Sequence, residues 1–205
     1  MNILKGSRGG GALSVQITGT DLLLGRLMSS EPTTAYTSQT EFTTSSWSAT
    51  AYQEAAVLKI DPAASCWATL AGKTVSAMTL ALYRTGGYMS ESSTLYVAKC
   101  LRTVVVGGSS QMTWNQYSTG NNWGTAGASN AADVDLSLMG AIGLTDTVTA
   151  MFTSSTANFV AAMQAWVNAS GVNNGFLLFP SFFADYHTWS GPTGANPPIL
   201  TVTYS

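Results

Sequence analysis

The stretch Lys73-Thr74-Val75-Ser76-Ala77-Met78-Thr79-Leu80-Ala81-Leu82-Tyr83 decides the fold. Successive side chains of a β-strand point to opposite faces of its sheet. In this stretch one face receives Val75, Ala77, Thr79, Ala81 and Tyr83, and the other receives Met78, Leu80 and Leu82. Both faces are mostly apolar, so the pattern predicts a strand in the middle of a sheet, covered on both sides.

Further strand patterns lie on both sides of this stretch. Short apolar runs rich in β-branched and aromatic residues predict strands over 56–60, 95–106, 133–138, 146–152, 175–179 and 199–204. Turn residues separate these runs, for example at Asp61-Pro62, Gly107-Gly108 and Asn173-Asn174-Gly175. Many short strands divided by turns are typical of an all-β protein, and we predict a two-sheet antiparallel sandwich of jelly-roll type.

One segment has the spacing of a helix instead of a strand. Its apolar residues fall at helical intervals, at Phe159, Val160, Met163, Trp166 and Val167. Thr156 or Asn158 stands where a capping residue is needed, and Gly171 follows the last periodic residue. The sequence therefore predicts one short helix near residues 157–168.

The first 28 residues differ in pattern from the rest of the chain. Residues 1–12 are rich in glycine and carry two cations, which is typical of a flexible arm. Residues 13–28 fit either a pair of strands or an arm that docks on a partner, with the apolar run Leu22-Leu23-Leu24 as the candidate docking contact. We therefore expect an N-terminal arm over residues 1–28 and a single sandwich domain over residues 29–205.

The composition excludes several classes of protein. Charged residues make up 9% of the 205 residues, and the 8 lysines and arginines are scattered, whereas a nucleic-acid-binding protein needs them clustered. An apolar share of 45% is too high for intrinsic disorder, and no run of about 18 apolar residues is present to cross a membrane. Three glycines follow the N-terminal cations where an export signal has an apolar run, so we expect no standard export.

Four motifs, read together, resemble a known family. They are the strand over 73–83, the stretch MTWNQYSTGNNW over 112–123, the helical stretch with its following strand over 160–179, and ANPPILTVTY over 195–204. Their order and spacing are similar to those of the DNRLRE domain, a family also grouped with carbohydrate-binding modules. The resemblance covers residues 55–205, whereas residues 13–54 do not match the N-terminal strands usual in the family.

The sequence offers few residues for catalysis or metal binding. The single histidine, His187, lies in a stretch of sequence that is typical of a loop, and no nucleophile motif surrounds any serine. Asp133 and Asp135 would point to the same face of a strand. They could form a carboxylate pair for glycoside hydrolysis or half of a calcium site, and the alternative is that they lie on a solvated strand edge. Cys66 and Cys100 are either two free thiols that act as small apolar residues or one disulfide. We therefore predict no catalytic, cofactor or metal site.

The aromatic residues are more informative. Trp67, Trp114 and Trp166 lie in apolar contexts or in the motifs of the family, and we expect them in the core. Trp47 and three further aromatic residues lie in polar stretches of sequence that are typical of loops. An exposed aromatic ring can stack on the apolar face of a sugar. Trp123, Tyr186 and Trp189 are therefore the candidate glycan contacts, and rings that cap the ends of the sandwich are the alternative.

Two functions follow as hypotheses, both without catalysis. The resemblance implies a β-sandwich with no general enzymatic activity, found in bacterial extracellular or cell-wall proteins and in phage-encoded proteins. The glycine-rich start, the missing export pattern and a surface rich in serine and threonine favour a structural protein on the outside of a phage particle. Such a capsid decoration, cement or head or tail appendage protein would bind the major capsid protein or another virion protein as a homo-oligomer, for example a trimer. The alternative is an extracellular carbohydrate-binding module that binds a glycan, and neither hypothesis involves nucleic acid or membrane.

Overall fold

A computed structural model describes the chain over residues 3–4, 12–36, 40–47, 52–88, 93–109, 111–135, 137, 140–144, 150–169, 172–180 and 186–205. The strands within these residues are β1 (Ile3–Leu4), β2 (Leu13–Thr18), β3 (Leu22–Met28), β4 (Glu41–Trp47), β5 (Tyr52–Ile60), β6 (Val75–Tyr88), β7 (Ser93–Lys99), β8 (Gln116–Ser118), β9 (Asn121–Asn122), β10 (Gly140–Leu144), β11 (Ala150–Ser154), β12 (Phe176–Pro180), β13 (Tyr186–Ser190) and β14 (Ile199–Tyr204). The helices are α2 (Cys66–Leu70) and α3 (Ala157–Asn168), and a 3-10 turn, η1 (Gly19–Asp21), joins β2 to β3.

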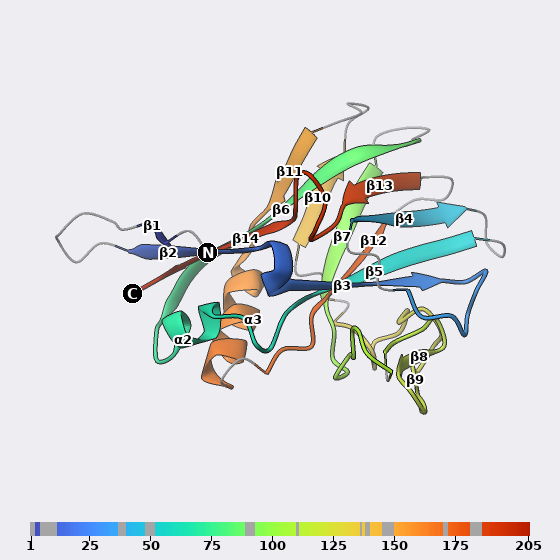
Figure 1. Ribbon diagram of the computed structural model, residues 1–205, viewed down its shortest axis with the longest axis horizontal. Helices are drawn as coiled ribbons and strands as arrows, with labels where there is room; N and C mark the ends of the chain where they lie inside the picture. Colours follow the sequence, from blue (N-terminus) through green and yellow to red (C-terminus); the bar gives the residue numbers. More distant parts are fainter. Residues whose placement is uncertain are drawn as a thin grey trace.

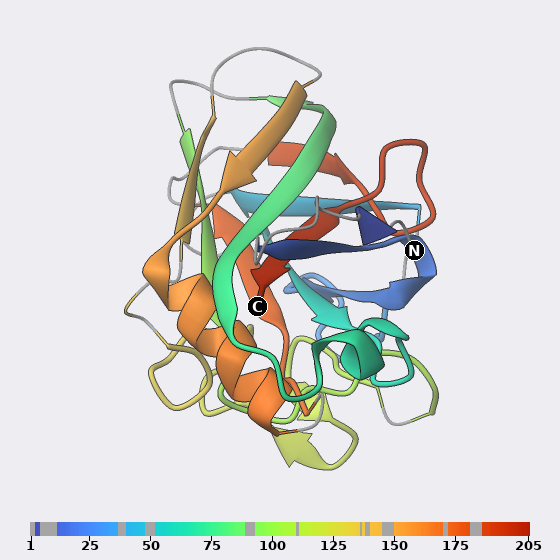
Figure 2. The ribbon, with the colours of Figure 1, turned by 90° about the vertical axis from the view of Figure 1, so that its left-hand side faces the viewer.

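One large antiparallel sheet encloses the main core. Neighbouring strands follow the order β1-β2-β14-β6-β13-β4-β5-β12-β7-β10, with β11 added beside β6 and β3 beside β5. The sheet curls so strongly that β10, at one end, lies against β11 (Figures 1 and 2). Two facing layers are therefore parts of one continuous sheet, and the predicted all-β, sandwich-like fold is confirmed.

The strand predicted from residues 73–83 is β6, which extends further than predicted, to Tyr88. It pairs with β14 over its first half, with β13 near its end, and with β11 along its opposite edge. The face that carries Met78, Leu80 and Leu82 is fully buried. The other face is only half-buried along most of its length, because no second layer of strands packs on it among the described residues. The expectation of a strand covered on both faces is therefore wrong for one of them.

The main core fills the space inside the curled sheet. Alternate residues of facing strands point inward, including Ile17 of β2, Leu58 of β5, Leu80 of β6 and Val202 of β14, and all four are fully buried. Burial of each such side chain contributes about 1.5–3 kcal/mol relative to its exposure to water. The inward alternation is what selects the register of each strand, because a slip by one residue would turn these side chains outward.

Helix α3 closes one end of this core. Its side chains Phe159, Met163 and Trp166 are buried, and the Trp166 and Phe176 rings lie 4.9 Å apart between centroids. The Thr156 hydroxyl accepts a hydrogen bond from the Phe159 backbone N–H at 3.3 Å, which caps the helix. The predicted helix over 157–168 and its Thr156 cap are thus confirmed. The single-turn helix α2, seen with α3 in Figure 2, was not predicted, because five residues carry too little periodicity.

Residues 13–28 are part of the sandwich and not of a separate arm. Strand β2 pairs along its full length with β14, and β3 pairs along its full length with β5. The alternative of a pair of strands, weighed for these residues, is therefore the one observed. The boundary expected after residue 28 does not separate two units, because both strands contribute side chains to the main core.

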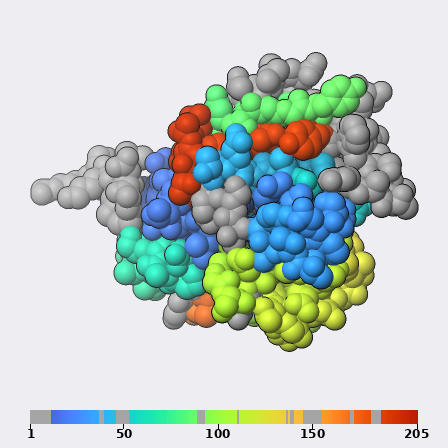
Figure 3. All heavy atoms as spheres, turned by 45° about the vertical axis from the view of Figure 1, so that its right-hand side comes forward, coloured from blue at the N-terminus to red at the C-terminus, as the bar shows by residue number. Residues whose placement is uncertain are grey.

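Residues 100–135 leave the large sheet and pack against its outer face. The strand predicted over 95–106 ends at Lys99. Of the strand predicted over 133–138, the described residues 133–135 and 137 form a single bridge, between Val134 and Cys100, and residues 136 and 138 lie outside the described residues. The strand predicted over 146–152 is β11, which begins at Ala150, and residues 145–149 lie outside the described residues. Figure 3 shows the yellow-green atoms of this excursion beside the blue N-terminal strands, where the Asn115 backbone N–H donates to the Pro32 carbonyl at 3.1 Å.

The excursion builds a second, smaller core with the sheet. Its members are Leu27, Ala55, Val57, Ala98, Cys100, Val104, Met112, Trp123, Ala128, Val134 and Leu177. The sheet residues of this cluster alternate with those of the main core along β5 and β12, so each of these two strands contributes to both cores. The Lys59 ammonium group donates to the Val104 carbonyl at 2.8 Å and ties the start of the excursion to β5.

Candidate functional site

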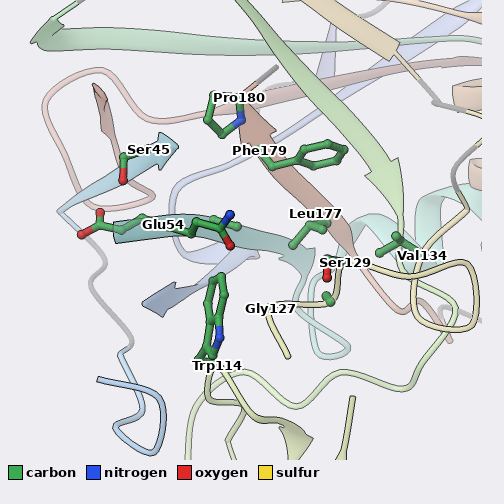
Figure 4. A pocket seen from close by; sticks show the side chains of 12 residues that line it. Ser45, Glu54, Trp114, Gly127, Ser129, Val134, Leu177, Phe179 and Pro180 are labelled. Carbon is green, nitrogen blue, oxygen red and sulfur yellow. The ribbon is translucent and has the colours of Figure 1, made fainter. Parts of the chain in front are cut away.

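The excursion covers only part of the outer face of β5 and β12, and a groove remains beside it (Figure 4). Its volume is about 190 Å³. The apolar lining consists of Ala55, Trp114, Ala128, Val134, Leu177, Phe179 and Pro180, and the polar side chains at its border are Ser45, Gln53, Glu54 and Ser129. A mostly apolar hollow with a few polar groups is the usual composition of a ligand site. Enclosing pockets typically measure roughly 300–1,000 Å³, so this groove suits a part of a longer ligand.

The strand pattern explains the floor of the groove. Phe176 and Leu178 of β12 point into the main core, so Leu177 and Phe179 between and beyond them point outward. On β5 the same alternation turns Ala55 outward. The small side chain of Ala55 leaves the hollow that the larger neighbours surround.

Trp114 forms one wall of the groove. The indole is half-buried and packs against the second core, and Figure 4 shows it pointing toward β5. The Gly127 backbone N–H donates to the Trp114 carbonyl at 2.7 Å, which joins the two segments of the excursion. A Cβ atom at Gly127 would lie 2.5 Å from Cη2 of the indole, and the φ angle of Gly127 is +79°. Only glycine therefore allows the ring to lie where it does.

Phe179 and Pro180 form the opposite wall. Figure 4 shows both on the far side of β5 from Trp114. The Phe179 ring is half-buried and lies 5.5 Å from the Tyr96 ring of β7, between centroids, in a tilted arrangement. Two aromatic rings thus border an apolar floor, with hydroxyl and amide groups nearby.

Asp133 holds the wall segment in place. Its carboxylate is fully buried and accepts hydrogen bonds from the Gly124 and Thr125 backbone N–H groups at 2.8 and 3.0 Å. The Arg102 guanidinium lies 3.2 Å from the same carboxylate. A buried carboxylate is tolerated only with such partners. Asp135 does not join it, since its carboxylate binds Ser137, and that hydrogen bond lowers the pKa of Asp135. The two aspartates do not form a common site.

Two of the three candidate glycan contacts are core residues, which corrects the expectation that they are exposed. Trp123 is 5% exposed, and its indole N–H donates to the Thr113 carbonyl at 3.0 Å. Trp189 is fully buried in β13, and its indole N–H donates to the Thr44 hydroxyl at 3.1 Å. The polar residues near each tryptophan supply hydrogen-bond partners for a buried indole, so they do not indicate that the ring is exposed. Tyr186 is 40% exposed and does not line the groove, although its partner across the β13–β4 pairing is Ser45 at the groove border.

The candidate docking residues also occupy the core. Leu22 and Leu24 are buried in the main core, and Leu23 is half-buried on the opposite face of β3. The run of three leucines reflects a strand that is covered on both faces, with Leu27 in the second core. The expectation of an exposed docking contact is therefore wrong for Leu22 and Leu24, which are structural residues of the main core.

His187 and the cysteines are likewise buried. His187 lies in strand β13 and is fully buried, which corrects the expected loop position. Cys66 belongs to the main core and Cys100 to the second core, and both are free thiols. The alternative of two thiols that act as small apolar residues is confirmed, and the disulfide is excluded. Within the described residues, no three His, Cys, Asp or Glu side chains gather in a way that could hold a metal ion.

Comparisons with known proteins add no relative. No protein-family model matches this chain, and no curated protein sequence matches it. The resemblance to the DNRLRE domain therefore stays an expectation that the four sequence motifs carry. In the described part of the chain, no helix is long and apolar enough to cross a membrane.

The groove was not predicted from the sequence. Trp114 was expected in the core, and its ring is half-buried between the second core and the groove. Phe179 was predicted to end a strand over 175–179, and alternation along β12 places its side chain on the outer face. The available signal was the pairing of Trp114 with a glycine-rich stretch at 124–127, but a sequence does not show which glycine faces which ring.

Proposed function

We propose that this protein is a non-enzymatic binding module that takes a glycan chain in the groove between Trp114 and Phe179. The observation that carries the proposal is the geometry of the two walls. Two aromatic rings flank an apolar floor, and Ser45, Gln53 and Ser129 stand close by. Aromatic rings stack on the apolar C–H faces of sugar rings, while hydroxyl and amide groups bind the sugar hydroxyls.

The shape of the groove supports a chain as the ligand. A volume of about 190 Å³ accommodates a small part of a polymer and does not enclose a whole small molecule. The floor also consists of paired strands, which fix the positions of Leu177 and Phe179 relative to β5 and β7. A rigid platform of this kind lowers the entropy lost on binding.

Binding to immobilised and soluble polysaccharides tests the proposal. We expect Trp114→Ala to weaken the affinity at least about tenfold, because it removes one stacking wall. Trp114→Phe keeps a ring and should retain part of the affinity. Tyr88→Ala is the matched control, since it removes an exposed aromatic ring of β6 that does not line the groove.

Thermal unfolding of each variant separates loss of binding from loss of fold. Equal binding by the wild type and a folded Trp114→Ala variant would show that the groove is not the site. If the wild type binds none of the polysaccharides, the proposed function is wrong.

A second candidate function is a structural protein on the outside of a phage particle, and a different observation favours it. Strand β2 pairs with β14 along one edge, but β1 covers only Ser14 and Val15 on the other. Among the described residues, no other strand pairs with that edge. An open edge can add a strand from a neighbouring subunit or virion protein. This contact would use the backbone of β2, not the side chains of Leu22–Leu24.

Native mass by light scattering tests the second candidate. An oligomer of the wild type that becomes a monomer in Gln16→Lys would support edge pairing, because a lysine on an edge strand opposes further pairing. Ala161→Lys, on the exposed face of α3, is the control and should leave the mass unchanged. A monomer in all three proteins would count against assembly through β2.

A further inference from the structure

The charges around the groove narrow the class of ligand, and this step rests on the proposed function. We infer that the groove is selective for uncharged polysaccharides and rejects chains of uronates, sulfated sugars or amino sugars.

The described residues that line the groove present no free charge to a ligand. Among them Glu54 is the one ionisable residue, and it is 7% exposed. The Glu54 carboxylate accepts a hydrogen bond from the Thr43 hydroxyl, and the Arg26 guanidinium lies 3.3 Å away. Figure 4 shows the carboxylate turned along β5, away from the floor of the groove. A charged sugar placed here would lose its water and gain no ionic partner.

None of the cations in the described part of the chain lines the groove. Six of the eight lysine and arginine residues lie in the described part, and four of them are buried or paired. These four are Arg26 beside Glu54, Lys59 on the Val104 carbonyl, Arg102 beside Asp133, and Arg84, which is 1% exposed. The other two, Lys73 and Lys99, do not line the groove. An anionic polysaccharide needs several accessible cations, and the described residues of the groove supply none.

A neutral chain matches what the walls provide. Trp114 and Phe179 offer ring faces, and Gln53 is an exposed amide with both donor and acceptor atoms. Hydroxyl groups and N-acetyl groups pair with such atoms without a counter-charge. The selectivity thus arises from the cost of desolvating a charge and not from a specific repulsion.

Matched polysaccharide pairs test this inference on the intact protein. Each pair shares a backbone and differs in charge: hydroxyethyl cellulose with carboxymethyl cellulose, dextran with dextran sulfate, and glycol chitin with glycol chitosan. Affinity electrophoresis and calorimetry give the dissociation constants, with Trp114→Ala as the control for binding in the groove.

We expect at least one neutral member to bind and its charged partner to bind roughly tenfold or more weakly. The affinity for the neutral member should change less than about twofold between about 50 and 500 mM salt, because no ionic contact is screened. Gln53→Lys should reduce the preference by strengthening binding of the anionic partner, since it adds a cation to the groove.

The outcomes separate the inference from the proposed function. Binding that depends on Trp114 but favours a charged member overturns the neutral class and leaves the glycan module standing. A Gln53→Lys variant that stays folded and shows an unchanged preference would also overturn the charge argument. Absence of any binding that depends on Trp114 overturns both.

Discussion

At the scale of single residues, Gly127 illustrates how a side chain that is missing can define a site. The Trp114 indole occupies the space where a Cβ atom of any other residue would lie. The positive φ angle adds a second reason for glycine, but several other glycines in the chain share it. The contact with the indole is therefore the property that sets Gly127 apart.

Gly127→Ala should weaken glycan binding, because the new methyl group would push the indole out of the wall. The matched control is Gly120→Ala, since Gly120 has a φ angle of +80° but no heavy atom within 4 Å of its added Cβ. Both variants should lose roughly 1 kcal/mol of stability from the φ angle alone. Fluorescence of the indole and binding assays should show a further change only in Gly127→Ala. Identical behaviour of the two variants would contradict a role of Gly127 in placing Trp114.

At the scale of elements, the excursion over 100–135 depends on Asp133 more than on its own strands. β8 and β9 are short and pair only with each other. The buried carboxylate instead joins Gly124, Thr125 and Arg102 into one unit. The excursion should therefore behave as a locally cooperative unit on the outside of the sheet.

Asp133→Asn should destabilise the protein by about 1–3 kcal/mol. The amide of asparagine is uncharged and has one acceptor oxygen, so it cannot replace the carboxylate, whose two oxygens each accept a backbone N–H group. Asp135→Asn, which loses only its contact with Ser137, should change stability by less than about 0.5 kcal/mol. Urea unfolding measures both. The thiols give a local readout, since Cys100 lies under the excursion and Cys66 lies in the main core. Labelling in Asp133→Asn should become faster at Cys100 and stay slow at Cys66, and equal acceleration at both would rule out local opening.

Periodicity allowed the long strands and the helix to be predicted, and it failed where tertiary contacts replace it. The strand over 199–204 and the helix over 157–168 agree with the structure, because each carries a clear apolar pattern. The pattern over 95–106 continues past the end of β7, yet Val104 points into the second core from irregular backbone, and Val134 does so from a single bridge. Trp123 and Trp189 were misjudged for a related reason. Polar neighbours can satisfy a buried indole as readily as they can surround an exposed one.

At the scale of the whole molecule, the cysteine thiols buried in the two cores should make the protein less stable at alkaline pH. Burial raises the pKa of both the Cys66 and the Cys100 thiol from 9.0 to about 12. The unfolded chain therefore releases these protons at a lower pH than the folded chain does. The contribution of the neutral thiols to stability is complete below about pH 9 and declines as the pH rises from about 9 to 12.

Urea midpoints measured between about pH 8 and 11 should fall more steeply for the wild type than for Cys66→Ala/Cys100→Ala. The double variant is the control for the other groups that titrate in this range. At about pH 8 neither thiol should react with a disulfide reagent until the protein unfolds, because the thiolate is the reactive form. Parallel pH profiles for the two proteins would show that the thiols do not contribute.

The position of β14 has a consequence for how the protein is made. The strand lies between β2 and β6, so residues from the two extremes of the described chain are neighbours in the sheet. During synthesis the edges of β2 and β6 that pair with β14 remain unpaired until residues 199–204 have left the ribosome. The sandwich can close only after that moment, and nascent chains that stall before it would carry two unpaired strand edges. We expect such stalled chains to be the species that chaperones capture and that aggregates most readily.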